Sequence, residues 1–213
     1  MNARVIAIVA GAALAAGCRP KADDPAPELV AGCTLDYLGD KKKPIELELY
    51  AAGADKLAQP LKEGGTVGLI VPPQGGWVIF VGARASNIDP CEVSLTGAAR
   101  DPGNGQLRLD QRTVNLKPIP AMMGSRKQPP LWGGPVDGDI STFANIAMCP
   151  NQWAAQGLDG GTVELSISLT DRDGKTATKT ANVALSCVEP QFKASCKCQC
   201  SKGYKLGQEC TVP

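Results

Sequence analysis

The cysteines have the most varied chemistry of any residues in this sequence, because a thiol can be lipidated, oxidised to a disulfide or bound to a soft metal. There are nine of them among 213 residues. Histidine, by contrast, is absent from the sequence. Without it there is no usual general base near neutral pH, and Ser-His-Asp sites, Cys-His sites and histidine zinc motifs are excluded. We therefore expect no catalytic residues of these kinds, no bound metal and no cofactor.

The first cysteine, Cys18, follows a segment typical of export. A basic start containing Arg4 leads into an apolar run over residues 5–16. The run is shorter than the ~20 residues that a membrane-spanning helix needs, so it predicts a secretory signal peptide. An ordinary signal peptide with a cysteine near its cleavage site remains the alternative.

The sequence Leu14-Ala15-Ala16-Gly17-Cys18 resembles the lipobox of bacterial lipoproteins, although the usual leucine three places before the cysteine is Ala15 here. The resemblance implies that residues 1–17 are removed and that Cys18 is lipidated, so that the membrane is a partner through the lipid. In the sorting rule known for many two-membrane bacteria, Arg19 in place of aspartate favours the outer membrane. We therefore expect a lipid-anchored protein of the cell envelope.

Setting Cys18 aside leaves eight cysteines, and an even number in an exported chain predicts a disulfide framework. Eight cysteines allow 105 pairings, so the connectivity stays open. A thiolate metal cluster in the Cys-x-Cys repeat is the rival hypothesis, because soft metals prefer such ligands. The eight are Cys33, Cys91, Cys149, Cys187, Cys196, Cys198, Cys200 and Cys210.

Residues 189–213 form a cysteine-rich tail. Its Cys196-Lys197-Cys198-Gln199-Cys200 run, followed by Gly203-Tyr204 and Cys210, resembles the C-terminal half of an EGF-like module. That resemblance implies a disulfide between Cys200 and Cys210. Only four cysteines are local where that module has six, so the likeness covers half a module.

Residues 18–32 are rich in proline and charge, which predicts an extended linker after the lipidated cysteine. Residues 33–188 carry short alternating apolar and polar segments between turn residues, which predicts a β-sandwich domain. One short helix is expected over 151–156, between Pro150 and Gly157. Strands are expected at 45–50, 66–71, 77–85, 92–97, 106–116, 163–169 and 175–187.

The last two predicted strands flank Asp171-Arg172-Asp173-Gly174, a strong hairpin signal. The stretch from Val163 to Cys187 resembles the closing hairpin of bacterial immunoglobulin-like domains. The sequence thus predicts an all-β chain, an immunoglobulin-like β-sandwich with a small disulfide-rich C-terminal extension. The turn also resembles the start of an EF-hand calcium loop, but the later ligands are missing, so we favour a plain, solvated turn.

Two tryptophans receive different predictions. Trp77 begins a continuously apolar segment and is expected in the core. Trp132 lies in a long loop over 117–140 that is rich in proline and glycine. Because tryptophan is enriched in binding hot spots, Trp132 is a candidate partner contact. Covering one end of the sandwich is its alternative role.

The net charge of the chain limits the classes of partner that it can bind. There are 22 basic and 21 acidic residues, and removing Arg4 with the signal segment leaves 21 of each. A neutral chain does not suit nucleic acid. We therefore expect a non-enzymatic binding or interaction module at the cell envelope, with a protein or glycan partner left open. A structural component of an envelope assembly is the alternative, and a carboxylate-based hydrolase is the third choice.

Overall fold

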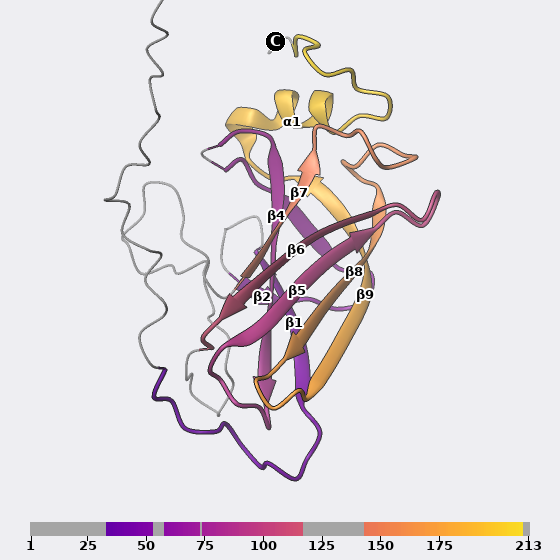
Figure 1. Ribbon diagram of the computed structural model, residues 1–213. Helices are drawn as coiled ribbons and strands as arrows, with labels where there is room; N and C mark the ends of the chain where they lie inside the picture. Colours follow the sequence, from indigo (N-terminus) through magenta and orange to yellow (C-terminus); the bar gives the residue numbers. More distant parts are fainter. Residues whose placement is uncertain (1–32, 53–57, 73, 117–142, 211–213) are drawn as a thin grey trace, which may run out of the picture. The chain divides into compact units, whose positions relative to one another are not determined.

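The computed structural model describes residues 33–52, 58–72, 74–116 and 143–210 (Figure 1). The contacts divide the chain into residues 1–32 and a second unit, Cys33–Pro213. The signal segment, Cys18, the linker, Trp132 and its whole predicted loop over 117–140 therefore lie outside the described residues. Among the residues that are described, no helix is both long enough and apolar enough to span a bilayer.

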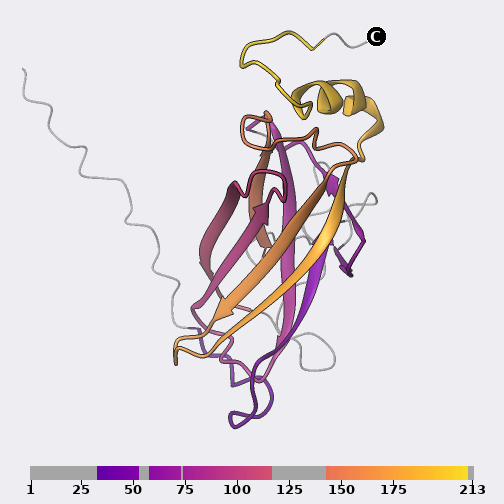
Figure 2. The same ribbon diagram turned by 90° about the vertical axis from the view of Figure 1, so that its right-hand side faces the viewer.

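The second unit is an all-β sandwich of the immunoglobulin-like kind, made of two sheets (Figures 1 and 2). Among the described strands, all pairs are antiparallel except β3 with β9. The four-stranded sheet has the order β2 (Ala58–Pro60), β1 (Glu46–Ala52), β4 (Trp77–Ser86), β7 (Phe143–Cys149). The five-stranded sheet has the order β3 (Thr66–Leu69), β9 (Thr176–Cys187), β8 (Thr162–Thr170), β5 (Val93–Arg100), β6 (Leu107–Val114).

The core lies between the sheets and follows from alternation. In β8, every second residue from Val163 to Leu169 is fully buried, whereas the residues between them face outward. Because side chains of a strand point to opposite faces in turn, one face of β8 joins the core and the other meets solvent. Ile79 and Val81 of β4 belong to the same core cluster from the opposite sheet.

Strand β4 is covered on both faces, as its continuous apolar sequence predicted. Trp77 is 3% exposed and lies in the main core, which confirms the prediction for this residue. On the other face, Val78 and Phe80 form a second buried cluster with Ile70 and Phe143. A strand buried on both faces occupies the middle of a domain.

The predicted strands are confirmed with small shifts at their ends, but two strands were missed and one helix was predicted wrongly. The short strand β2 and strand β7, which follows the predicted loop, were not expected. Residues 151–156 do not form the predicted helix. Asn151 accepts a hydrogen bond from the amide of Ala154 and donates one to the carbonyl of Gln156, so its side chain replaces helical pairing.

The helical residues lie instead in the cysteine-rich tail. A single 3-10 turn, η2 (Pro190–Phe192), leads into the helix α1 (Lys193–Gln199). Phe192 packs edge-on against Trp77, with 6.4 Å between ring centroids. The tail is therefore a part of the folded unit that packs against the sandwich.

Candidate functional site

The strand register defines two opposite ends of the sandwich, which we call the base and the cap. At the base, Ser94, Thr170 and Thr176 stand side by side at the ends of β5, β8 and β9. Cys91 precedes β5 and therefore belongs to the base. Cys149 and Cys187 end β7 and β9 at the cap, where α1 lies (Figure 1).

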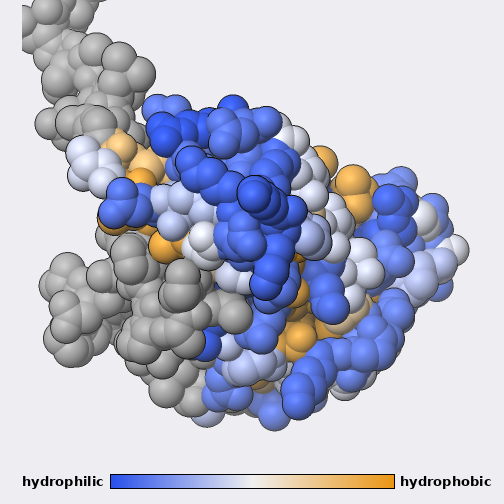
Figure 3. Space-filling model, turned by 90° about the horizontal axis from the view of Figure 1, so that it is seen from below, coloured by the Kyte–Doolittle hydropathy of each residue, from blue (hydrophilic) through white to orange (hydrophobic). Residues whose placement is uncertain are grey.

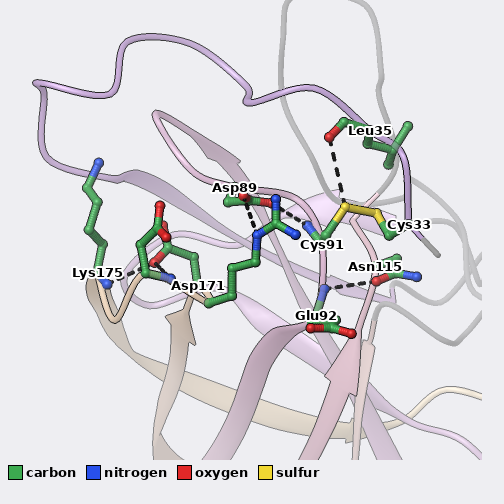
Figure 4. Close-up of polar contacts among 10 residues, drawn as sticks. Cys33, Leu35, Asp89, Cys91, Glu92, Asn115, Asp171 and Lys175 are labelled. Carbon is green, nitrogen blue, oxygen red and sulfur yellow. Dashed lines mark hydrogen bonds and ion pairs between the residues drawn. A yellow bond between two sulfur atoms is a disulfide. The ribbon is translucent and has the colours of Figure 1, made fainter. Parts of the chain in front are cut away.

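At the base, the first described residue is cross-linked to the sandwich (Figure 4). Cys33 forms a disulfide with Cys91 across 58 residues of sequence. The neighbouring Asp89 is buried; its Oδ1 accepts a hydrogen bond from the amide of Cys91 at 3.0 Å. Its Oδ2 pairs with Arg172 Nε of the β8–β9 turn at 2.7 Å. The start of the domain, the entry to β5 and the closing hairpin are thus joined.

Lys175 makes a second connection at the base. Its ammonium group donates to the hydroxyl of Tyr37 at 2.7 Å and to the carbonyls of Lys43 and Asn87 at 2.9 and 3.0 Å. It also lies over the Tyr37 ring at 5.4 Å. These contacts hold the segment after Cys33 against the hairpin turn. Seen from this end, the surface is predominantly hydrophilic (Figure 3).

One aspartate of the hairpin turn, Asp171, stabilises the turn itself. Asp171 Oδ1 accepts hydrogen bonds from the amides of Asp173 and Lys175 at 3.1 and 2.8 Å. The plain turn is therefore observed, but the expectation of a solvated surface is wrong for Asp171, which is 3% exposed.

Within the described ranges, the only convergent set of three or more potential metal ligands consists of cysteines.

Other buried carboxylates also hold backbone. Asp101 accepts hydrogen bonds from the amides of Gly103 and Ala155 at 3.2 and 2.6 Å. Glu189 accepts one from the amide of Val71 at 2.7 Å. Together with Asp89 at the base, these groups stabilise loops by accepting hydrogen bonds from backbone amides.

The outer face of the five-stranded sheet carries a regular array of short, uncharged side chains, which we call the hydroxyl face. Neighbours in the array are hydrogen bonded: Thr170 with Thr176 at 2.9 Å, Thr178 with Ser168 at 3.0 Å, and Gln111 with Ser94 at 3.2 Å. Three successive rows across the strands are Thr176–Thr170–Ser94–Thr113, Thr178–Ser168–Thr96–Gln111 and Thr180–Ser166–Ala98–Leu109.

None of these residues carries a charge, and the next row toward the cap contains the ion pair of Arg100 with Glu164 at 3.5 Å. Strands lie about 4.8 Å apart, and alternate residues repeat every ~6.7 Å along a strand. The hydroxyl face is thus a regular grid of uncharged side chains, most of which can form hydrogen bonds, on β9, β8, β5 and β6. Figure 2 shows the strands that carry it. The sequence signal that could have indicated this face is the alternation of threonines and serines over 162–182.

A small depression lies elsewhere, beside β2 and β3. It has a volume of about 290 Å³ and is lined by Ala51, Gln59, Pro60, Leu61, Lys62, Gly65 and Thr66. Ligand pockets generally occupy about 300–1,000 Å³ and have several converging polar groups. The depression is at the lower end of that range, and Lys62 is the charged residue of its lining.

At the cap, three disulfides fix the tail. Cys187 pairs with Cys196, Cys149 with Cys200 and Cys198 with Cys210. All eight cysteines of the predicted framework are thus disulfide-bonded, which confirms the disulfides over the thiolate cluster in this structure.

The disulfide that the EGF-like resemblance implied, between Cys200 and Cys210, is wrong. Residues four apart on a helix share a face, whereas residues two apart do not. Helix α1 therefore turns Cys196 and Cys200 together toward the strand ends, where both are buried. Cys198 points elsewhere and pairs with Cys210.

The cap is also held by hydrogen bonds. The amide of Asn151 donates to the carbonyl of Gln199, and the amide of Leu158 donates to that of Cys200, both at 2.8 Å. The amide of Cys187 donates to Asp159 Oδ1 at 2.8 Å. Asn151 lies in the segment whose helix prediction was wrong, and no local pattern in the sequence indicated these contacts. Comparison with protein families, curated proteins and solved structures found no match to this chain.

Proposed function

We propose that this chain is a lipid-anchored protein of the cell envelope whose sandwich is a non-enzymatic interaction module. The observation that supports the proposal best is the cross-link of Cys33 to Cys91 at the base. A linker from a lipidated Cys18 would enter the domain at that disulfide. Residues 19–32 reach at most ~50 Å when extended.

The base suits the end of a tether. A force applied at Cys33 would be transmitted through the disulfide to Cys91, just before β5. The ion pair of Asp89 with Arg172 would carry part of that force to the β8–β9 turn. The ammonium group of Lys175 holds the following segment as well. The attachment point is therefore stabilised by several contacts, and the sides of the sandwich remain accessible to a partner.

The hydroxyl face is the surface that we assign to interaction. Its side chains are short, so that fixing them at an interface costs little conformational entropy compared with lysine or glutamate. Each hydroxyl can both donate and accept a hydrogen bond. A neutral partner rich in hydrogen-bonding groups, either a protein strand or a glycan, fits such a surface better than a charged polymer does.

The anchor is tested by labelling cells with an alkyne-tagged fatty acid and separating their membranes. The natural chain should carry the label and sediment with the outer membrane. Cys18→Ser should lose the label and leave the membrane fraction, whereas Cys33→Ala should keep the label, because it removes only the base disulfide. A labelled Cys18→Ser chain, or an unlabelled natural chain in the cell interior, would contradict the anchor.

The interaction surface is tested by placing a photo-activatable amino acid at Thr178, in the middle row of the hydroxyl face. Glu48, exposed on β1 of the other sheet, is the matched control position. Irradiation of intact cells should give a discrete cross-linked product from position 178 and none from position 48. Equal products from both positions, or none from position 178, would argue against this surface.

One observation favours the alternative, a structural component of an envelope assembly. Leu107 and Leu109, at the edge of the hydroxyl face on β6, are 43% and 58% exposed. In an assembly these leucines would pack against another chain. The detergent-extracted protein would then elute as one large complex, and Leu109→Ser would release the chain from it.

A further inference from the structure

The sulfur atoms at the cap lie close enough together to share one ligand. The Sγ atoms of Cys187, Cys196 and Cys200 all lie within 4.8 Å of one another. Those of Cys196 and Cys200, one helical turn apart on α1, are 3.9 Å apart without being bonded to each other. Cys149 adds a fourth sulfur through its bond to Cys200. All four residues are buried.

These distances resemble those of a tetrahedral metal site. With zinc–sulfur bonds of about 2.3 Å, the sulfurs of a four-cysteine zinc site lie about 3.8 Å apart. Cys196 and Cys200 already have that separation. The two disulfide pairs would have to open to it, and the separation of Cys187 and Cys200, at most 4.8 Å, would have to shorten by at most about 1 Å. Cys149 would move into the site as its bond to Cys200 opens. Side-chain rotation supplies movements of this size.

The backbone that carries these sulfurs does not depend on the disulfides alone. The carbonyls of Gln199 and Cys200 accept hydrogen bonds from the amides of Asn151 and Leu158, so the end of α1 is docked independently. Cys149 and Cys187 end strands that are paired within the two sheets. We therefore expect the four cysteines to remain neighbours when their sulfur–sulfur bonds are absent.

We propose that the reduced form of this chain binds one borderline or soft divalent ion, of the kind of Zn²⁺, through Cys149, Cys187, Cys196 and Cys200. A dithiol or phosphine reductant supplies four electrons, and with four protons the two disulfides become four thiols. Binding of the ion then displaces protons from these thiols, because thiolate is the ligand form. The same four sulfurs can therefore fix α1 either by two disulfides or by one ion.

The test uses the full chain with Cys18→Ser, which removes the ninth thiol. The protein is reduced with a phosphine under inert gas and titrated with Zn²⁺, and Co²⁺ is used as a spectroscopic substitute. We expect one ion per chain and the visible absorption of tetrahedral cobalt bound to thiolates. Cys196→Ser should weaken binding at least roughly tenfold, since even partners outside the ligand shell contribute 10–100-fold.

Two double variants serve as controls, because each removes a disulfide outside the cluster: Cys198→Ser/Cys210→Ser at the cap and Cys33→Ser/Cys91→Ser at the base. Both should retain one ion per chain. Failure to bind, binding of two or more ions, or equal weakening in the cap control would overturn the proposal. If reduction unfolds the chain, Zn²⁺ should restore the near-ultraviolet signal of buried Trp153, and failure to restore it would count equally against it.

This inference concerns the sulfur positions alone and does not rest on the proposed function. Loss of lipid labelling would leave the zinc titration unaffected, and absence of zinc binding would leave the anchor unaffected. The two experiments can therefore fail separately.

Discussion

Removal of the disulfide between Cys149 and Cys200 should cost far more stability than removal of the disulfide between Cys198 and Cys210. The first links residues 51 apart, and loop-closure entropy for that separation corresponds to about 4 kcal/mol. The second closes a separation of 12, which corresponds to about 3 kcal/mol. Entropy alone therefore predicts similar losses from the two variants.

The two disulfides differ in how deeply they are buried in the structure. Cys200 is fully buried in the main core cluster, and its disulfide ties α1 to the end of β7. Residues 201–210 are exposed or half-buried, so the loop closed by Cys198 and Cys210 can open without exposing the core. Only the first disulfide acts on the global unfolding equilibrium, whereas opening of the second is a local event.

We therefore expect Cys149→Ala/Cys200→Ala to lower the free energy of unfolding by about 4 kcal/mol. Cys198→Ala/Cys210→Ala should lower it by less than about 1 kcal/mol, as for surface substitutions. Urea unfolding followed by tryptophan fluorescence and circular dichroism measures both values. Equal losses in the two variants would refute the reasoning, and so would a loss below about 1 kcal/mol in the first.

Three further predictions concern the sandwich. Gly97→Val should destabilise the protein by about 1–3 kcal/mol in urea unfolding, because its Cβ would collide with the side chain of Ala144 across the core. Asp89→Ala should cost about 1–3 kcal/mol in the same assay, because it leaves a buried amide and a guanidinium without their acceptor. The side-chain amide of Asn182, and then its backbone N–H, hold the pKa of Glu63 below its ordinary value of 4.5. Because the pKa is lowered on folding, this contact contributes stability above the ordinary pKa and loses it as the pH falls through the lowered value. A carboxyl titration by NMR should therefore show Glu63 ionised at a lower pH than free glutamate.

Each of these has a control. Ala98→Val, which adds the same kind of bulk on the outer face of β5, should leave stability unchanged within about 0.5 kcal/mol. Asp89→Asn should recover part of the loss, because its side-chain oxygen can still accept from the amide of Cys91. Asn182→Ala should return the pKa of Glu63 toward its ordinary value. An unchanged Glu63 titration in that variant would show that another group causes the shift.

The sequence predicted the β-strands of the sandwich well because their periodicity is local. The alternation of Val163, Leu165, Ile167 and Leu169 specifies both the strand and its inward face, and Asp171 to Gly174 specifies the turn. The helix over 151–156 was wrong for an equally local reason, since the side chain of Asn151 competes for the backbone. Strand β7 was missed because its residues follow a long irregular stretch without a clear turn signal.

The pairing of the cysteines could not be predicted, because it depends on where α1 begins and on which of its faces meets the sandwich. A shift of the helix by two residues would exchange the roles of Cys198 and Cys200. Lys175 illustrates the same limit at the base. Its partners belong to residues 37–43 and to Asn87, which are brought together only by the packing of the two sheets.

The compartment of the chain connects the two proposals, because it decides which form of the cap exists. If Cys18 is lipidated outside the cytoplasm, the oxidising surroundings favour the disulfides Cys149–Cys200 and Cys187–Cys196. In a reducing compartment the same sulfurs would be thiols that a divalent ion could bind. An acyl-labelled chain isolated from the membrane should thus contain no free thiol among the eight framework cysteines. If the acylated chain instead contained four free thiols and one zinc ion, the cap would be reduced even though the chain is exported. Export would then not imply an oxidised cap.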